Sequence, residues 1–310
     1  MTLEGILPIW KPKGFTSHDV VAKVRRIVRI KRIGHTGTLD PQVTGVLPLC
    51  IGRATRLVEY VQEMPKSYEA VLLLGLSTDT QDLSGQVLQR LERPGDLLTP
   101  QQVTEAIAKF VGTIEQVPPM YSAVKVEGRR LYELARQGVE VERKARTVTI
   151  YSIEVLNTDW SGELPEVRFR VSCSKGTYIR TLCADIGEAL GIPAVMGELV
   201  RTSTGNIGPE QCLTLEQVEE LHEHGSLSDK LIPMEHVLGF LPSVRLDEHL
   251  TRRALQGQKI RLEPQQWPHA NSSQADLGKH IAGFSDDGRL IGIFEWDPQH
   301  GLLLPNKIFS

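Results

Sequence analysis

The segment Val167-Arg-Phe-Arg-Val-Ser-Cys173, with the Ser174-Lys-Gly-Thr-Tyr-Ile-Arg180 that follows it, decides the fold class of this chain. Apolar and polar residues alternate strictly in the first part, which is typical of a strand with one buried face. Beyond it, the spacing of Ile179, Leu182 and Ile186 predicts a helix with an inward apolar stripe. A half-buried strand that runs into a helix favours a fold that mixes helices and strands.

Other elements extend this pattern in both directions. We expect a helix with Ser17 as N-cap, a helix from Ala54 to about Gln62, a buried strand over Tyr68–Leu76, and a helix capped by Thr99 that ends near Gly112. After Leu241-Pro242 the chain changes to short strands separated by Gly, Pro and Asp. The order predicts an α+β body over residues 1–240 and a small β-barrel over residues 241–310.

The length and composition are those of a two-domain globular protein. The chain has 310 residues, of which 40% are hydrophobic and 24% are charged. The longest apolar stretch is too short to span a bilayer, and no signal peptide is evident. The four cysteines are far apart, which argues against a disulfide framework and a thiolate zinc site. We therefore expect a soluble protein of the cytoplasm.

The charge is distributed unevenly along the chain. The formal net charge is only −3, but residues 20–39 carry six basic residues and no acid, whereas residues 209–240 carry seven acids and one lysine. A local positive field at the N-terminal end would attract a polyanion such as nucleic acid. The alternative is a solvated basic helix face, and charge alone does not separate the two.

The loop Gly34-His-Thr-Gly-Thr-Leu-Asp-Pro41 directly follows the basic stretch. It is neither a P-loop nor a dinucleotide-binding glycine motif. Asp40 is the one carboxylate between Asp19 and Glu59, so it would lie in positive surroundings, which keep a carboxylate ionised for work as a nucleophile or base. The alternative is an ordinary Asp-Pro turn.

Two further residues, Arg180 and Tyr68, would suit an active site, although each has a plainer structural explanation. Arg180, at the junction of the strand and the helix, would suit a rigid pairing with a carboxylate, or else is a surface helix residue. Tyr68 would suit stacking on a base, or else is part of the core.

The pair His222-Glu-His224 has no third ligand in a metal-binding pattern, so we expect no metal.

Taken together, four motifs resemble the bacterial tRNA pseudouridine-55 synthase (TruB) family. These motifs are Lys11-Pro-Lys-Gly-Phe-Thr-Ser17, Gly34–Pro41 with Thr44-Gly-Val-Leu-Pro48, the run from Val117 to Tyr132, and Cys173–Arg180. The resemblance covers roughly residues 5–205 and is looser over 206–240. It implies a mixed, largely antiparallel central sheet flanked by helices, the pseudouridine-synthase fold, with a small PUA-like RNA-binding domain at the C-terminus.

The resemblance also implies an activity and the residues that perform it. The activity is isomerisation of a T-loop uridine of tRNA to pseudouridine, with no cofactor and no metal. Asp40 matches the family's essential aspartate, Arg180 the arginine paired with it, and Tyr68 the tyrosine that packs on the target base. Tyr178 and Leu199 match further pocket residues of the family. His35 matches a residue that helps to hold the T loop open.

The expected partner is tRNA, through its T arm and, by way of the C-terminal domain, its acceptor stem. The RNA contacts that we expect are Lys11, Lys175, Arg129 and Arg130. Val200 stands where the family often has arginine, which removes one potential phosphate contact. No protein partner is implied, and we expect a monomer.

Two other functions remain open at this point. One is an RNA-folding chaperone or assembly factor with a vestigial pocket, a role that is also compatible with the enzyme. The other is a retaining glycosidase, which needs two carboxylates about 5 Å apart. No second acid accompanies Asp40 in the matched motifs.

Overall fold

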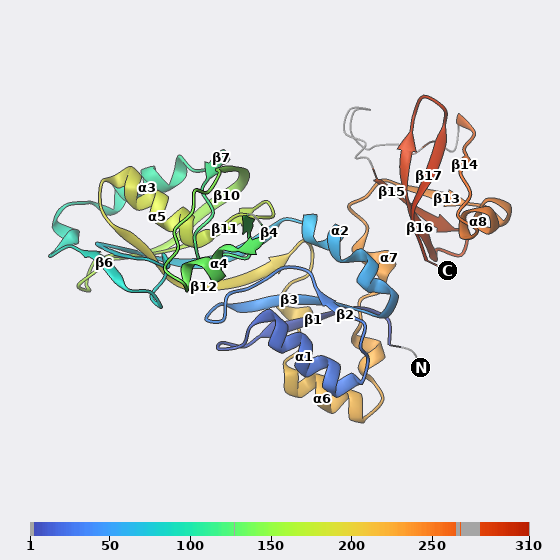
Figure 1. The fold of residues 1–310 in the computed structure, drawn as a ribbon, viewed down its shortest axis with the longest axis horizontal. Coiled ribbons are helices and arrows are strands. Elements are labelled where there is room, and N and C mark those ends of the chain that lie inside the picture. The colour runs from blue at the N-terminus through green and yellow to red at the C-terminus, as the bar shows by residue number, and fades with distance from the viewer. Residues whose placement is uncertain (1–2, 127, 265–266, 268–279, 310) are drawn as a thin grey trace.

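The computed structural model describes all residues except 1–2, 127, 265–266, 268–279 and 310. Its main feature is an eight-stranded mixed sheet flanked by helices (Figure 1). The strands follow one another in the order β1 (Gly5–Lys11), β3 (Thr44–Ile51), β12 (Ala194–Thr204), β4 (Lys66–Leu74), β11 (Glu166–Cys173), β10 (Arg146–Asp159) and β7 (Gly112–Gln116), with β2 (Ile33–His35) paired to β3.

One pair of strands in this sheet is parallel and the other neighbouring pairs are antiparallel, as expected of a mixed, largely antiparallel sheet. The parallel pair joins β3 to β12 through Thr44 with Val200 and Gly45 with Arg201. Gly45 has φ +114°, and a Cβ there would lie 2.2 Å from the carbonyl oxygen of Arg201. Only glycine permits this close approach, so Gly45 fixes how the two strands meet.

Two groups of helices cover the two halves of the sheet, and each half has its own apolar core. Helices α3 and α5 pack on β4, β10 and β11, whereas α1 and α6 pack on β1 and β3. The helices are α1 (Ser17–Val28), α2 (Val58–Glu63), α3 (Pro100–Ala108), α4 (Leu131–Ala135), α5 (Ile179–Leu190), α6 (Leu215–Glu223), α7 (Met234–Val237) and α8 (Glu248–Leu255). No helix in the described part of the chain is long and apolar enough to cross a membrane.

Short elements connect these layers. They are the 3₁₀ turns η1 (Gly52–Leu57), η2 (Pro94–Asp96), η3 (Pro209–Gln211) and η4 (Leu227–Lys230), and the hairpins β5 (Leu76–Thr78) with β6 (Val87–Arg90) and β8 (Lys125–Val126) with β9 (Arg129–Arg130). The helix predicted from Ala54 is therefore a 3₁₀ turn that continues into α2. The helix capped by Thr99 ends at Ala108.

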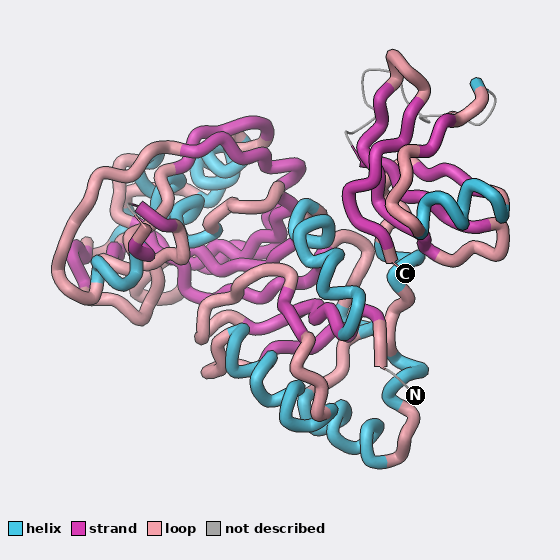
Figure 2. The backbone as a smooth tube through the Cα atoms, turned by 45° about the vertical axis from the view of Figure 1, so that its right-hand side comes forward, coloured by secondary structure: helices cyan, strands magenta, loops and turns pink. Residues whose placement is uncertain are grey.

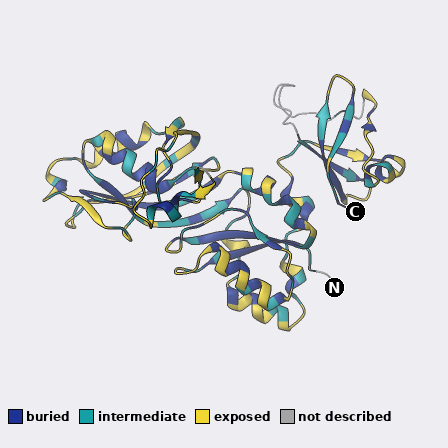
Figure 3. Ribbon diagram, viewed as in Figure 1, coloured by how far each residue is buried: buried dark blue, intermediate teal, exposed yellow. Residues whose placement is uncertain are grey.

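The basic helix α1 lies beside the acidic helix α6, with Lys23 Nζ 3.6 Å from Glu219 Oε2. Figure 3 shows the alternation of buried and exposed residues along α1. The expectation of a local positive field at the N-terminal end therefore stays a prediction. The two oppositely charged blocks are neighbours in space, and Arg25 donates a hydrogen bond to the carbonyl of Ile33 at 2.6 Å.

The described residues after 242 include a five-stranded sheet in which β13 and β15 are parallel. Its order is β13 (Ser243–Leu246), β15 (His280–Ser285), β16 (Leu290–Asp297), β17 (Leu302–Ile308) and β14 (Ile260–Arg261). The sheet curls (Figure 2). Within the described residues its two edge strands, β13 and β14, do not pair. The predicted barrel is thus a half-barrel.

This half-barrel shares a core with the main sheet. One apolar cluster contains Val46 and Leu57 from the first part of the chain together with Ile293 and Phe309. Polar contacts reinforce it: the Tyr60 hydroxyl lies 3.0 Å from Asn306 Oδ1. The C-terminal sheet is therefore packed onto the turn η1 and the helix α2.

Candidate active site

A cavity of about 360 Å³ opens where the two halves of the main sheet meet. Tyr68 on β4 and Leu199 on β12 line it and also pack against both apolar cores. Segments far apart in the sequence complete its walls, namely residues 36–43, 62–66, 122–123 and 174–180. Residues 36–43 precede β3 and residues 174–180 follow β11, and the strand order β3, β12, β4, β11 brings these two segments to the same cavity.

Asp40 lies in a loop that is fixed from the start of α1. The backbone N–H of Leu39 donates a hydrogen bond to the hydroxyl of Ser17 at 2.9 Å. Ser17 was expected to cap the helix, but Thr16 is the N-cap and forms a capping box with Asp19. The Ser17 hydroxyl is thus free to hold the residue before the candidate catalytic carboxylate.

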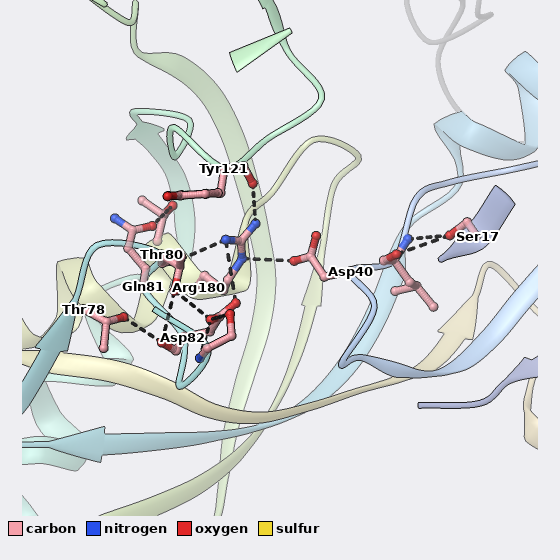
Figure 4. Close-up of polar contacts among 11 residues, drawn as sticks. Ser17, Asp40, Thr78, Thr80, Gln81, Asp82, Tyr121 and Arg180 are labelled. Carbon is pink, nitrogen blue, oxygen red and sulfur yellow. Dashed lines mark hydrogen bonds and ion pairs between the residues drawn. The ribbon is translucent and has the colours of Figure 1, made fainter. Parts of the chain in front are cut away.

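The guanidinium of Arg180 organises the charged end of the cavity (Figure 4). Its Nε lies 3.0 Å from Asp40 Oδ2, and its Nη1 lies 3.9 Å from Asp82 Oδ2. Two backbone carbonyls, those of Thr80 and Tyr121, each accept a hydrogen bond from it at 2.8 Å. The side chain is 5% exposed, whereas that of Asp40 is 41% exposed. Arg180 is thus a fixed internal cation that presents an accessible carboxylate to the cavity.

The electrostatic surroundings of Asp40 act in opposite directions. Burial raises the pKa of Asp40 above its ordinary value, and the charge of Asp82 adds to this increase. Arg180 and Lys11 oppose the increase but do not cancel it. Asp40 is therefore a stronger base than a solvated aspartate, although it is paired with an arginine.

Asp82 is a site residue that the sequence analysis missed. Its Oδ1 accepts hydrogen bonds from the hydroxyl of Thr80 at 2.7 Å and the backbone N–H of Ser84 at 2.9 Å, while Oδ2 faces Arg180. A signal was present, because an Asp-Leu-Ser-Gly turn follows a buried strand. Asp82 does not line the cavity, so it does not supply the second carboxylate that a retaining glycosidase needs there.

The aromatic residues of the cavity are Tyr68 and Tyr178. Burial raises the pKa of Tyr68, so its phenol is neutral at physiological pH, and nearby Arg201 acts in the opposite direction. Tyr178 is the N-cap residue of α5, at the junction from which Arg180 projects. Both tyrosines and Leu199 are partly buried.

A second group of cations is buried on backbone carbonyls. Arg201 is 1% exposed, and its Nε donates to the carbonyl of Val46 at 2.6 Å. Lys66 is 6% exposed and donates to the carbonyl of Met64 at 2.6 Å. Burial lowers the pKa of Lys66 to about 8. Neither Arg201 nor Lys66 was singled out from the sequence, although both line the cavity.

Lys11 belongs to this buried group, and its expected role as an RNA contact is wrong. It is 0% exposed, and its ammonium donates to the carbonyls of Pro12 at 2.9 Å and Pro41 at 3.2 Å. Burial lowers the pKa of Lys11 to about 8. Because Pro41 follows Asp40, Lys11 anchors the loop from within and does not reach a phosphate.

The remaining predicted RNA contacts lie outside the cavity or at its rim. Lys175 lines the cavity and forms an ion pair with Glu63 of α2. Arg129, on β9, is exposed and donates to the side chain of Gln137 at 2.5 Å. Arg130 follows it and lies over the ring of Tyr132, 5.8 Å from the centroid. Lys175 and Arg129 are exposed and Arg130 is partly exposed, and their role as RNA contacts stays a prediction.

His35 lies at the end of β2, next to the cavity-lining residue Thr36, with its ring 5.2 Å from that of His18. Burial lowers the pKa of His35 to about 4, and His18 and Arg201 contribute to this decrease. The imidazole is therefore neutral at physiological pH, which suits stacking.

Two buried hydroxyls, those of Ser122 and Thr204, have no hydrogen-bond partner within the described residues. Ser122 lines the cavity. In the described part of the chain no three His, Cys, Asp or Glu side chains are grouped to hold a metal ion. The expectation that the reaction needs neither metal nor cofactor stays a prediction.

Known proteins match this chain in sequence and in fold. The model of the TruB family pseudouridylate synthase N-terminal domain matches residues 25–179, and that of the tRNA pseudouridylate synthase B C-terminal domain matches 180–239. The tRNA pseudouridine synthase B of Bacillus licheniformis is 46% identical over 98% of this chain and 97% of its own length. That of Halalkalibacterium halodurans is 43% identical over 100% and 99%.

Solved structures agree with these matches. A crystal structure of a Cbf5–Nop10–Gar1 complex superposes with a TM-score of 0.76 and 28% identity over 99% of this chain and 85% of that one. An H/ACA RNP bound to a substrate RNA containing 2′-deoxyuridine gives 0.73 and 27%, over 99% and 86%. The chain therefore belongs to the TruB family of pseudouridylate synthases.

Proposed function

We propose that this protein isomerises the uridine at position 55, in the T loop of tRNA, to pseudouridine, with Asp40 as the catalytic carboxylate and without a cofactor or metal. The observation that carries the proposal is the Asp40–Arg180 pair, 3.0 Å apart, at a cavity that also presents the ring of Tyr68. Membership of the family supports pseudouridine formation, and the names of the relatives support tRNA as the substrate.

The chemistry needs an ionised carboxylate and a closed site. The bond from C1′ to N1 of the uracil breaks, the freed base turns, and a bond from C1′ to C5 forms, while the C5 proton leaves and N1 gains one. Asp40 attacks C1′, attacks C6, or first takes the C2′ proton, and each route begins with the carboxylate charged. Arg180 favours that charged form in a cavity that otherwise disfavours it.

A uridine inside a folded loop reaches Asp40 only after extrusion, which costs a few kcal/mol. Packing of the uracil against Tyr68, Tyr178 and Leu199 offsets this cost, and the neutral His35 ring takes the place of the extruded base. Lys175, Arg129 and Arg130 bind phosphates, which sets the affinity for tRNA and its orientation.

The affinity for tRNA should therefore fall steeply with added salt, and a flat salt profile would contradict the assignment of these contacts.

The proposal divides the chain into a catalytic unit, residues 1–240, and a PUA-like RNA-binding unit, residues 241–310, that contacts the acceptor side of the tRNA. The protein acts as a monomer in the cytoplasm, where its substrate is.

Deleting residues 241–310 would expose the shared apolar core, so substitution is the cleaner test of the C-terminal unit. Replacing the exposed Lys259 and Arg261, at the edge strand β14, with serine should weaken binding of whole tRNA more than of an isolated T arm. Equal losses on both RNAs would contradict an acceptor-side role.

The catalytic role is tested by Asp40→Asn, which keeps the shape of the side chain and removes its charge. Pseudouridine formation in a T-arm transcript should fall by about 10⁴-fold or more, with RNA affinity retained. Asp229→Asn, an exposed carboxylate outside the cavity, is the matched control and should match the parent. Undiminished product from Asp40→Asn would overturn the assignment. The same variant separates a coexisting tRNA-folding role, which would persist without product.

A further inference from the structure

The side chain of Gln116 forms an unusual contact next to the cavity. Gln116 is the last residue of β7 and is 2% exposed. Its Oε1 accepts a hydrogen bond from the backbone N–H of Tyr178 at 2.7 Å, and its Nε2 donates to the carbonyl of the same residue at 3.1 Å. One carboxamide thus makes the donor–acceptor pair that a residue of a neighbouring strand would make.

The backbone that Gln116 holds is the one from which two site residues project. Tyr178 is the N-cap of α5 in an extended conformation, and its side chain makes no capping hydrogen bond. Its carbonyl also accepts the N–H of Leu182 at 3.0 Å, the first bond of the helix. The contact therefore fixes the residue at which α5 begins, and with it the direction of Tyr178 and of Arg180 two residues later.

The same connection reaches Arg180 a second time. The carbonyl of Tyr121, five residues after Gln116, accepts a hydrogen bond from Arg180 Nη2 at 2.8 Å. Ser122, the next residue, lines the cavity, and the chain then continues to the exposed Arg129. Three hydrogen bonds thus hold residues 116–121 to residues 178–180.

We infer that Gln116 is a positioning residue for the reaction: its carboxamide holds the backbone of Tyr178 so that the Tyr178 ring and Arg180 meet the extruded nucleoside in a productive arrangement. The inference rests on the proposed function. Gln116 does not line the cavity and so acts through these two residues. A misplacement of about 1 Å at a reacting group costs about 10²-fold in rate, so a small shift of Tyr178 and Arg180 has a measurable effect.

The decisive variant is Gln116→Glu, because its hydrogen bonding depends on protonation. A protonated glutamic acid offers one donor and one acceptor, as glutamine does, whereas the ionised form sets a negative charge against the carbonyl of Tyr178. Because position 116 is 2% exposed, burial should raise the pKa of the introduced carboxyl by about 3 units above its ordinary value of about 4.3. The kcat of the variant relative to the parent, on a T-arm transcript, should therefore be about tenfold lower at pH 8.5 and should recover towards one as the pH falls to about 6. The ratio removes the titration of Asp40, which the two proteins share.

Gln116→Met is the matched control, since it has similar length and can form neither hydrogen bond. Its kcat ratio to the parent should be low and independent of pH. Arg146, opposite Gln116 in the β7–β10 register, and Arg180 keep their charge over this range, so the introduced glutamate is the group whose protonation differs between the proteins. RNA affinity should change less than about twofold in both variants, because the phosphate contacts are intact.

The outcomes are distinct. A pH-independent ratio for Gln116→Glu, or a kcat equal to that of the parent in both variants, would overturn the inference. If Gln116→Met fails to fold, Gln116→Glu at low pH retains both hydrogen bonds and still gives the ratio. A parent that forms no pseudouridine in the T arm would contradict the proposed function instead, whereas an active parent with unaffected Gln116 variants would contradict the positioning role alone.

Discussion

Arg180 and Arg201 line the same cavity and are similarly buried, at 5% and 1% exposure, but they have different partners. Arg180 lies between the carboxylates of Asp40 and Asp82. Arg201 donates to the backbone carbonyls of Val46 and, at 3.5 Å, of Gly37, and it also forms a side-chain hydrogen bond with Tyr68. A cation paired with carboxylates, as Arg180 is, holds a carboxylate in position and favours its ionised form. Arg201 holds chain segments in place, and among the described residues no carboxylate forms an ion pair with it.

The carbonyl-bound group is the larger of the two, because Lys11 and Lys66 resemble Arg201 in this respect. Burying a charge costs several kcal/mol, and carbonyl dipoles repay only part of it, which is why burial lowers the pKa of both lysines. The positive charge that remains around the cavity favours a negative group inside it. An ionised Asp40 and the phosphate of an extruded nucleotide both meet that requirement.

Replacement of Arg180 should have the largest effect on activity. Arg180→Met leaves two carboxylates without their shared counterion, and kcat/KM for pseudouridine formation should fall by about 10³-fold or more. Arg180 lowers the pKa of Asp40, so the acid limb of the remaining activity should move to higher pH. An activity within tenfold of the parent, with the acid limb unmoved, would remove the distinction between the two arginines.

Replacement of Arg201 should instead affect stability first. Arg201→Met leaves the carbonyls of Val46 and Gly37 without their donor and replaces a fully buried cation by a shorter neutral side chain. The free energy of unfolding in urea should fall by about 3 kcal/mol, while the activity of the folded fraction falls less than about tenfold. A stable variant with an activity loss as large as that of Arg180→Met would show that the carbonyl-bound cation also takes part in the chemistry.

The variant Asp82→Asn tests how the second carboxylate beside Arg180 affects Asp40. The charge of Asp82 raises the pKa of Asp40, so its removal should move the acid limb of the pH–rate profile to lower pH, with a loss of about tenfold at neutral pH as the turn around Arg180 loosens. Rate measurements from about pH 5 to 8 show the direction. A shift to higher pH would mean that Asp82 acts on Asp40 other than by its charge.

Lys66→Met should give the smallest effect, and it appears in the pH dependence of stability. Burial lowers the pKa of Lys66 from 10.5, the value for an exposed lysine, to about 8 in the folded protein. Between these two values the unfolded chain therefore binds more protons than the folded protein does. The free energy of unfolding contributed by Lys66 therefore rises with pH over that window. Urea titrations at pH 8 and 9.5 should show a rise smaller by about 1 kcal/mol in the variant. Identical rises would mean that the lysine is not carrying the buried charge.

Local sequence predicted the elements that carry the site because their signals are local. The Thr99 capping box, the Gly191 end of α5 and the alternation over β11 all appear as expected. The motif resemblance anticipated that Asp40 and Arg180 meet, and the structure places them 3.0 Å apart. Their catalytic roles stay proposals until the variants are assayed.

What the sequence did not predict depends on backbone partners and on contacts between distant segments. The carbonyls of Thr80 and Tyr121 hold Arg180, and a carbonyl carries no residue identity that a motif can display. For the same reason Lys11 resembles a surface lysine in the sequence and yet is fully buried. The neighbourhood of α1 and α6, which reduces the expected positive field, follows from tertiary packing alone.

The short parallel pairing of β3 with β12 determines when the cleft exists during synthesis. Thr44 leaves the ribosome early, whereas its partner Val200 follows about two thirds of the way along the chain. Closing a loop of that length is entropically costly and makes such contacts slow to form. A nascent chain that stops before β12 contains both Asp40 and Arg180 but lacks the strand that joins β3 to β4, so we expect the cavity to form only after translation has passed the last strand of the main sheet.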